Sequence, residues 1–437
     1  MTWAADASRA LTDTFSGSFD ADGVVVASAA LDADETSVAT DPVGLAADRR
    51  FEIGSVTKTM TATMLALLAE QGKLGLDDGI GRWLSAGPHG AITIREVATH
   101  TSGLPAVAPN RRVHEADPAD PWAGYTFEMA EAGLRESVAA SGHPWRYSNL
   151  GFQILGLILE RAGGMDFGAL LSENLFDPLS MVNSGVRSRG GGTLLSGHAN
   201  GREVPQWAHP LGAGGVEATI EDLARYARAC LFPPDSLLGK AIRLTQQPVV
   251  RVSPDVEQAL AWAVGGDGVR EHSGATGGFS ACVSIDSSRG RALAMLVSNG
   301  GSPAFTTHLK RAAHMALAGQ DPRQAAAPQP WPSWRDDVRD AARELLNGQA
   351  AQVHARLIPA VRQRITVEQL ERAWANKTRD AGAAGRISIP HHEIAANGAV
   401  VATLSIEFTS GPLRLRMIVP PSGGLGGLTF PPSAQTP

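Results

Sequence analysis

Three short motifs that could together perform acyl transfer through a serine ester lie in one order along the chain. They are Ser55-Val56-Thr57-Lys58, Tyr147-Ser148-Asn149 and His272-Ser273-Gly274. A serine hydroxyl is a poor nucleophile until a base takes its proton, and a lysine amine or a tyrosine phenolate can do so. The glycine-rich run 272–279 predicts a strand that a ligand can approach closely. The motifs therefore predict an acyl-enzyme formed on Ser55.

The three-residue spacing of Ser55 and Lys58 places both side chains on one face of a predicted helix start. Helix N-termini direct N–H groups and partial positive charge toward such a serine. A lysine with its ordinary pKa of about 10.4 stays protonated at pH 7, so burial or a nearby cation must lower the pKa of Lys58 before it can act as base. Tyr147 is the alternative proton carrier. The sequence leaves this choice open.

Elements with apolar periodicity must position these motifs. Met60, Met64, Leu67 and Leu68 form an apolar stripe on the helix predicted at 55–71, and Thr219 is a predicted helix N-cap. A sheet built from both ends of this region, with helices between its strands, predicts an α/β or α+β core. The other predicted elements are a strand at 23–30, helices at 150–162 and 304–318, and strands at 262–264, 280–285 and 292–297.

The composition changes near residue 319. We predict a serine hydrolase domain at 1–319, a linker rich in Pro and Ala at 320–332, and a small α+β domain at 333–437. The last domain has predicted helices at 333–348, 350–363 and 366–379, and predicted strands at 386–389, 400–408, 413–419 and 425–430. It resembles small cystatin-like or nuclear-transport-factor-like domains, which implies a role in capping the site, binding substrate or forming a homodimer.

Five segments of the first domain resemble the superfamily of class C β-lactamases, D-peptidases and esterases: 51–59, 99–105, 145–149, 212–215 and 272–279. The resemblance covers residues 10–318 and implies a β-lactamase-like antiparallel sheet flanked by helices, plus an all-helical subdomain. It implies that Ser55 is the acylated nucleophile and that Lys58 and Tyr147 form the general base pair. It also implies that Asn149 binds the acyl side chain of the substrate.

The same resemblance places His272, Ser273 and Gly274 where penicillin-binding enzymes usually carry Lys-Thr-Gly, and it makes the oxyanion hole from the N–H groups of Ser55 and Ala275. A histidine is often neutral near pH 7, so its grip on a substrate carboxylate is weaker than that of lysine. His-x-Gly is more typical of esterases, D-aminopeptidase-like enzymes and peptide-cyclising thioesterases. Glu217 either meets a substrate amine or is a solvated carboxylate.

We therefore expect a serine acyl hydrolase acting on an ester or on an amide or peptide of a D-amino acid. One alternative is an acyltransferase or peptide-cyclising thioesterase that passes the acyl group to an amine or alcohol. Another is a non-catalytic binding protein. The expected partner is a small-molecule or peptide acyl substrate, with no cofactor.

A net charge of −6 argues against nucleic acid as a partner. The N-terminus lacks the features of a signal peptide, and no apolar run approaches the roughly 20 residues that span a bilayer, so we expect a cytoplasmic protein with no membrane partner. Cys230 and Cys282 are expected to be buried thiols. The neighbours His391 and His392 face opposite sides of a predicted strand, so we expect no metal site there.

Overall fold

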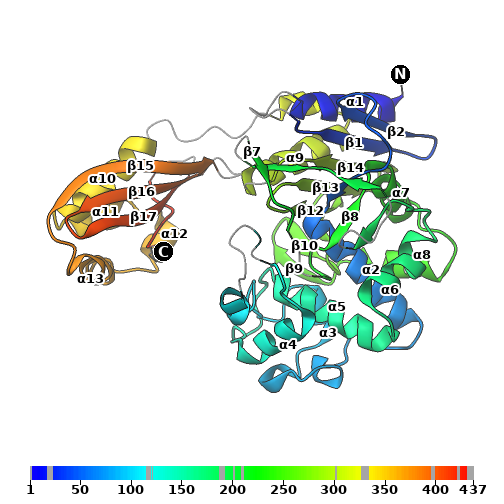
Figure 1. Cartoon of the computed structure of the whole chain (residues 1–437), viewed down its shortest axis with the longest axis horizontal. Coiled ribbons are helices and arrows are strands. Elements are labelled where there is room, and N and C mark those ends of the chain that lie inside the picture. Colours follow the sequence, from blue (N-terminus) through cyan, green and yellow to red (C-terminus); the bar gives the residue numbers. More distant parts are fainter. Residues whose placement is uncertain are drawn as a thin grey trace. The chain divides into compact units, whose positions relative to one another are not determined.

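The computed structural model describes residues 2–16, 23–114, 120, 122–186, 192–199, 202–207, 211–300, 303–325, 334–394, 399–420 and 424–430. The chain divides into two compact units (Figure 1). Residues 1–301 and 309–325 make up the first unit, and residues 302–308 and 326–437 the second. The domain limits expected at 319 and 333 stay a prediction, and each unit is described by itself.

An eight-stranded antiparallel sheet forms the centre of the first unit, in the order β2-β1-β14-β13-β12-β11-β10-β9. The sheet joins residues from both ends of the unit, because β1 pairs with β14 (Figure 1). Because β1 and β13 are buried along their whole length, both faces of the sheet must be covered. Helix α1 (Trp3–Phe15) packs on β1 and β2, and α7 (Ile220–Leu231) packs on β1, β13 and β14. This architecture confirms the predicted fold class.

The strands of this sheet are β1 (Val26–Leu31), β2 (Thr36–Asp41), β9 (Val250–Ser253), β10 (Val256–Gln258), β11 (Ala263–Gly265), β12 (Arg270–Ala275), β13 (Ser280–Asp286) and β14 (Arg291–Val297). A smaller sheet has the order β4-β8-β3-β5. Its strands are β3 (Arg49–Glu52), β4 (Gly185–Val186), β5 (Thr193–Leu194) and β8 (Val216–Ala218). Strands β6 (Gly197–Ala199) and β7 (Arg202–Val204) form a hairpin.

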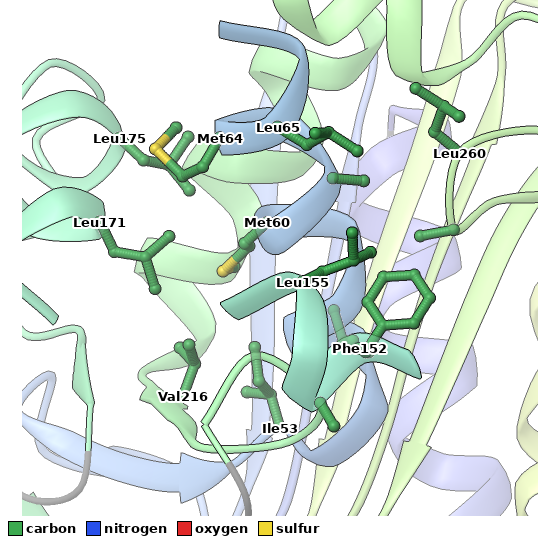
Figure 2. Packing of buried hydrophobic residues seen from close by; sticks show 14 of the residues in the cluster. Ile53, Met60, Met64, Leu65, Phe152, Leu155, Leu171, Leu175, Val216 and Leu260 are labelled. Atoms are coloured by element: carbon green, nitrogen blue, oxygen red, sulfur yellow. The ribbon is translucent and has the colours of Figure 1, made fainter. Parts of the chain in front are cut away.

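Helix α2 (Thr57–Glu70) runs through the middle of the first unit. The predicted helix is present and its apolar stripe is buried, and every other residue from Thr57 to Leu68 is buried as well. The helices α5 (Asn149–Gly163) and α8 (Leu237–Thr245) both contact α2. Figure 2 shows Met60, Met64 and Leu65 of α2 among side chains from the surrounding elements. A helix held this way gives its first turn a fixed position.

The remaining helices of the first unit are short and lie mostly between β3 and β8 in the sequence. They are α3 (Ile94–Ala98), α4 (Phe127–Glu136), α6 (Phe167–Leu171) and the π-helical turn η5 (Ser172–Phe176). Helix α9 (Pro303–Leu317) follows the sheet, and its residues from 309 on belong to this unit. Thr219 caps α7 by accepting a hydrogen bond from the Asp222 N–H, which confirms that predicted helix start. Cys230 and Cys282 are buried free thiols, and burial raises the pKa of each to about 12.

The second unit is an antiparallel sheet in the order β15-β16-β17-β18 with helices packed against it. Val400, Ala402, Leu404 and Ile406 alternate along β16 and bury one face of the sheet beneath α10. The single helix predicted at 350–363 is wrong, because the backbone is extended at Leu357, before Pro359 starts a new turn.

The helices of this unit are α10 (Trp334–Leu346), α11 (Ala350–Arg356), α12 (Pro359–Arg362) and α13 (Val367–Thr378). Its strands are β15 (Ala384–Ile394), β16 (Val400–Phe408), β17 (Gly411–Val419) and β18 (Gly427–Thr429). His391 contacts Glu393, while His392 stacks on Trp334 with ring centroids 4.8 Å apart. In the described ranges of both units, no helix has the length and apolar character needed to cross a membrane.

Candidate active site

Ser55 lies on a 3₁₀ turn, η1 (Gly54–Val56), that leads directly into α2. The residue before it, Gly54, has a φ of 50°, a left-handed conformation that favours glycine. This turn leaves the Ser55 side chain partly exposed, while Lys58 in the next turn is completely buried. The nucleophile therefore meets solvent at a point where the amine beneath it does not.

Three oxygen atoms surround the Lys58 amine. Its Nζ lies 2.9 Å from Ser55 Oγ, 2.7 Å from Asn149 Oδ1 and 2.7 Å from the carbonyl oxygen of Ala213. Burial holds the pKa of Lys58 well below its ordinary value. A neutral amine donates two hydrogen bonds and accepts one, and the amide and carbonyl oxygens can only accept. In the neutral form of Lys58 the lone pair therefore faces the Ser55 hydroxyl.

Tyr147 completes the group on the other side of Ser55. Its ring centroid lies 5.0 Å from Lys58 Nζ, and its phenol shares a hydrogen bond with the Ser55 side chain. Burial raises the pKa of Tyr147, and the bond to Ser55 opposes that rise only in part. The phenol is therefore protonated at neutral pH, which makes it a proton donor in the resting site.

The segment that carries Tyr147 is fixed by its neighbours. Ser148 caps α5 by accepting from the Gly151 N–H, and it donates to the carbonyl oxygen of Pro105. The Ser148 N–H donates to Nδ1 of His100, a buried residue with a φ of 60°. The His100 ring packs on Tyr147 with centroids 4.5 Å apart. The turn at 100–103 thus fixes the position of the Tyr147 ring through His100.

A close contact between η1 and β12 brings two backbone N–H groups to the nucleophile. A side chain at Gly274 would lie 2.0 Å from the Ile53 carbonyl oxygen and 2.9 Å from the Ser55 nitrogen. A side chain at Gly54 would lie 2.9 Å from the Ala275 nitrogen. Only glycine at both positions permits this approach. The nitrogen atoms of Ser55 and Ala275 therefore lie beside the same small volume, in the arrangement that an oxyanion hole requires.

His272 is buried and its Nδ1 lies 2.7 Å from the carbonyl oxygen of Ala261. A carbonyl only accepts, so Nδ1 carries the proton and Nε2 of the neutral ring is an acceptor. Burial lowers the pKa of His272 to about 3. The centroid of the His272 ring lies 6.5 Å from that of the Tyr147 ring. With this lowered pKa, His272 carries no positive charge near pH 7.

Glu217 is not available to a substrate amine, nor is it a solvated carboxylate. It is buried on β8, where its Oε2 lies 2.8 Å from NH1 of the equally buried Arg50 on β3. Glu52 on β3 is the strand partner of Glu217 on β8, and both side chains are buried. The motifs do not predict this ion pair, because Arg50 lies outside them.

Two cavities flank this group. One, of about 240 Å³, is lined by Ser55, Asn149 and Ala275 together with Trp122 and Trp207. The other, of about 190 Å³, is lined by Tyr147, His272, Ser273 and further residues that include Glu271 and Lys310. The motifs do not predict four of these residues: Trp122, Trp207, Glu271 and Lys310. Trp122 and Trp207 lie outside the three motifs, so the motifs give no signal for them.

The chain is similar to several known proteins. It is 32% identical over 152 residues to Penicillin-binding protein 4* of Bacillus subtilis, covering 32% of this chain and 31% of that protein. It is 29% identical over 245 residues to Esterase EstB of Burkholderia gladioli, covering 45% of this chain and 62% of that protein. The alignments thus span less than two thirds of these relatives.

The fold is similar to that of a solved class C β-lactamase, with a TM-score of 0.61 and 19% identity over 71% of this chain and 96% of that one. The Beta-lactamase family matches residues 20–319, which is most of the chain and contains all three motifs. The protein therefore belongs to the Beta-lactamase family, as the resemblance of its motifs predicted.

Proposed function

We propose that the protein is a serine acyl hydrolase that cleaves esters through an acyl-enzyme on Ser55. The observation that carries this proposal is the contact of a completely buried lysine amine with a partly exposed serine hydroxyl, 2.9 Å from Nζ to Oγ. The lowered pKa of Lys58 and the raised pKa of Tyr147 favour Lys58 as the base and the phenol as a proton donor.

The reaction begins when Ser55 Oγ attacks the substrate carbonyl and its proton passes to Lys58 Nζ. The N–H groups of Ser55 and Ala275 stabilise the oxyanion, as the approach of η1 to β12 allows. The bond to the leaving oxygen then breaks, and Tyr147 supplies the proton that this oxygen needs. The Lys58 ammonium then gives its proton to the Tyr147 phenolate, which restores both groups. Water repeats the sequence on the acyl-enzyme, which releases the acid and restores the Ser55 hydroxyl.

Each cavity then has a role in binding. The larger one holds Ser55, Ala275 and Asn149, so the acyl group lies there, against the aromatic walls of Trp122 and Trp207. An apolar acyl chain of moderate size suits these walls. The smaller cavity contains Tyr147, the proton donor, so the leaving group lies on that side. The names of the relatives, which include an esterase and a penicillin-binding protein, support acyl chemistry in general.

Labelling with a fluorophosphonate tests the proposal. We expect the probe to modify the wild-type protein at Ser55, the Ser55→Ala variant to remain unlabelled, and p-nitrophenyl butyrate hydrolysis to fall by about 10³-fold or more in that variant. Ser196, a serine outside both cavities, gives the control variant Ser196→Ala, which should label like wild type. Equal labelling of Ser55→Ala would instead support the non-catalytic alternative.

Transfer to an amine, considered from the sequence, has lost its main support because Glu217 is paired with Arg50. We therefore expect linear acid rather than cyclic product from peptidyl thioesters. Turnover of nitrocefin should be weak or absent, since neutral His272 offers no charge to the carboxylate of a β-lactam.

A further inference from the structure

Two of the residues that line the smaller cavity, Glu271 and Lys310, form an ion pair with each other. Glu271 lies on β12 beside His272, and both of its oxygen atoms are engaged by α9. Lys310 Nζ contacts Oε1, and His314 Nε2 lies 2.9 Å from Oε2. Lys310 is the cation that lines this cavity, together with Glu271, and the ion pair between them leaves no net charge for a ligand.

Two imidazoles of opposite hydrogen-bonding character line the same cavity. His272 uses Nδ1–H on Ala261, so its Nε2 is an acceptor. His100 uses Nδ1 to accept from the Ser148 N–H, so its Nε2 carries the proton. That Nε2–H is buried and has no hydrogen-bond partner among the residues that the structure describes. Burial lowers the pKa of both rings, which keeps them neutral at pH 7.

A neutral polar group satisfies this arrangement better than an anion does. A hydroxyl or amide can donate as well as accept, so it can donate a hydrogen bond to His272 Nε2. A carboxylate only accepts. It would face the lone pair of His272, and it would lie near the negative charge of Glu271 with Lys310 already committed.

We propose that this cavity is the leaving-group subsite and that it selects neutral polar alcohols over alcohols that carry a carboxylate, with the ion pair of Glu271 and Lys310 as the element that enforces the choice. The proposal rests on the proposed esterase function. It names the class of ester: an apolar acyl group joined to an uncharged, hydrogen-bonding alcohol.

Two esters that differ only in charge test it. Butyrate esters of 3-hydroxybenzamide and 3-hydroxybenzoate have the same acyl group and leaving groups of nearly equal size. We expect the full-length protein at pH 8 to prefer the amide-bearing ester by about 10-fold in kcat/KM. In Glu271→Gln, Lys310 becomes available to a carboxylate, and the preference should shrink about 3-fold or more. Loss of Glu271 removes the main cause of the raised pKa of His314, so this side chain carries less charge at pH 8 than in the wild type.

Further variants separate charge from misfolding. Glu271→Gln combined with Lys310→Met should restore the wild-type preference, because both charges are gone. Lys310→Met alone leaves Glu271 with His314 as its remaining partner and should widen the preference. Glu131 is a matched control: its side chain is 11% exposed, compared with 12% for Glu271, and pairs with Arg161 outside both cavities. Glu131→Gln should leave the preference unchanged.

A wild-type preference for the carboxylate ester, or an identical ratio in wild type, Glu271→Gln and Lys310→Met, would overturn this assignment while leaving the esterase function standing. Failure of the function itself has a different signature: neither ester would be hydrolysed in a manner that depends on Ser55, and the subsite assignment would fall with it.

Discussion

The proposed role of Lys58 as a base depends on the uncharged groups around its amine. Its described partners are a hydroxyl, an amide and a carbonyl, and burial alone lowers its pKa. A carboxylate in place of the Asn149 amide, whose Oδ1 lies 2.7 Å from Nζ, would favour the ammonium form. The base at this site is thus maintained by the absence of a negative charge at one position.

Asn149→Asp should therefore shift the pH profile of ester hydrolysis. A base works above its pKa, so the wild-type rate is retained as pH falls until it reaches the lowered pKa of Lys58. A carboxylate at 149 raises that pKa, and we expect the acidic limb of the kcat/KM profile to move about 1–3 units toward higher pH. Asn149→Leu removes the hydrogen bond without adding charge, and its acidic limb should not move upward. An unshifted limb in Asn149→Asp would argue against Lys58 as base.

Single residues were predictable where chemistry required a particular type at a particular spacing. Ser55, Lys58 and Tyr147 were named from their motifs, and the structure brings them together. Partners that contribute a backbone atom were not predictable, because any residue type has a carbonyl. The Ala213 oxygen on Lys58 and the Ala261 oxygen on His272 are of this kind.

At the scale of elements, the contact between η1 and β12 is the least tolerant in the site. We expect Gly274→Ala to reduce kcat by about 100-fold or more, because the added methyl group would lie 2.0 Å from the Ile53 oxygen and force the two N–H donors apart. Overpacking of this kind also costs about 1–3 kcal/mol of stability. Ester kinetics and thermal unfolding of the variant measure the two effects.

Gly266 provides the control for that experiment. A side chain there would make ordinary contacts, at 3.6 Å from the Asp255 oxygen, and its φ lies outside the left-handed region. Gly266→Ala should keep the wild-type rate. If Gly274→Ala hydrolysed esters as fast as Gly266→Ala, the oxyanion hole would have to lie elsewhere.

The type of a helix or strand, and often its length, could be predicted from the sequence, but the elements that pack on it could not. The strand predicted at 400–408 coincides with β16, and the helix at 150–162 differs from α5 by one residue at each end. The stripe predicted one buried face of α2 but not the contacts of α5 and α8 with it, because periodicity describes one element and not what packs on it. The break at Leu357 involves a bridge to Leu425, a partner distant in sequence.

At the scale of the whole molecule, the described residues include two large hydrophobic cores that share no residue, one in each unit. Leu155 on α5 is fully buried in the first, beside helix α2, and Leu404 on β16 is fully buried in the second. Figure 2 shows Leu155 in its cluster. Each core is continuous and joins the helices of its unit to a sheet of that unit, so each unit has the physical basis for unfolding by itself.

We therefore expect two thermal transitions, and a matched pair of substitutions should move them separately. Leu404→Ala opens a cavity worth about 2–5 kcal/mol in the smaller unit, which should lower one midpoint by roughly 10 °C and leave the rate of Ser55 acylation unchanged at 25 °C. Leu155→Ala should lower the other midpoint and slow acylation, since α5 carries Asn149 at its first turn. Calorimetry and fluorophosphonate labelling measure both. A single transition shifted by either substitution would show that the cores are energetically coupled, and the second unit would then be part of what holds the serine in place.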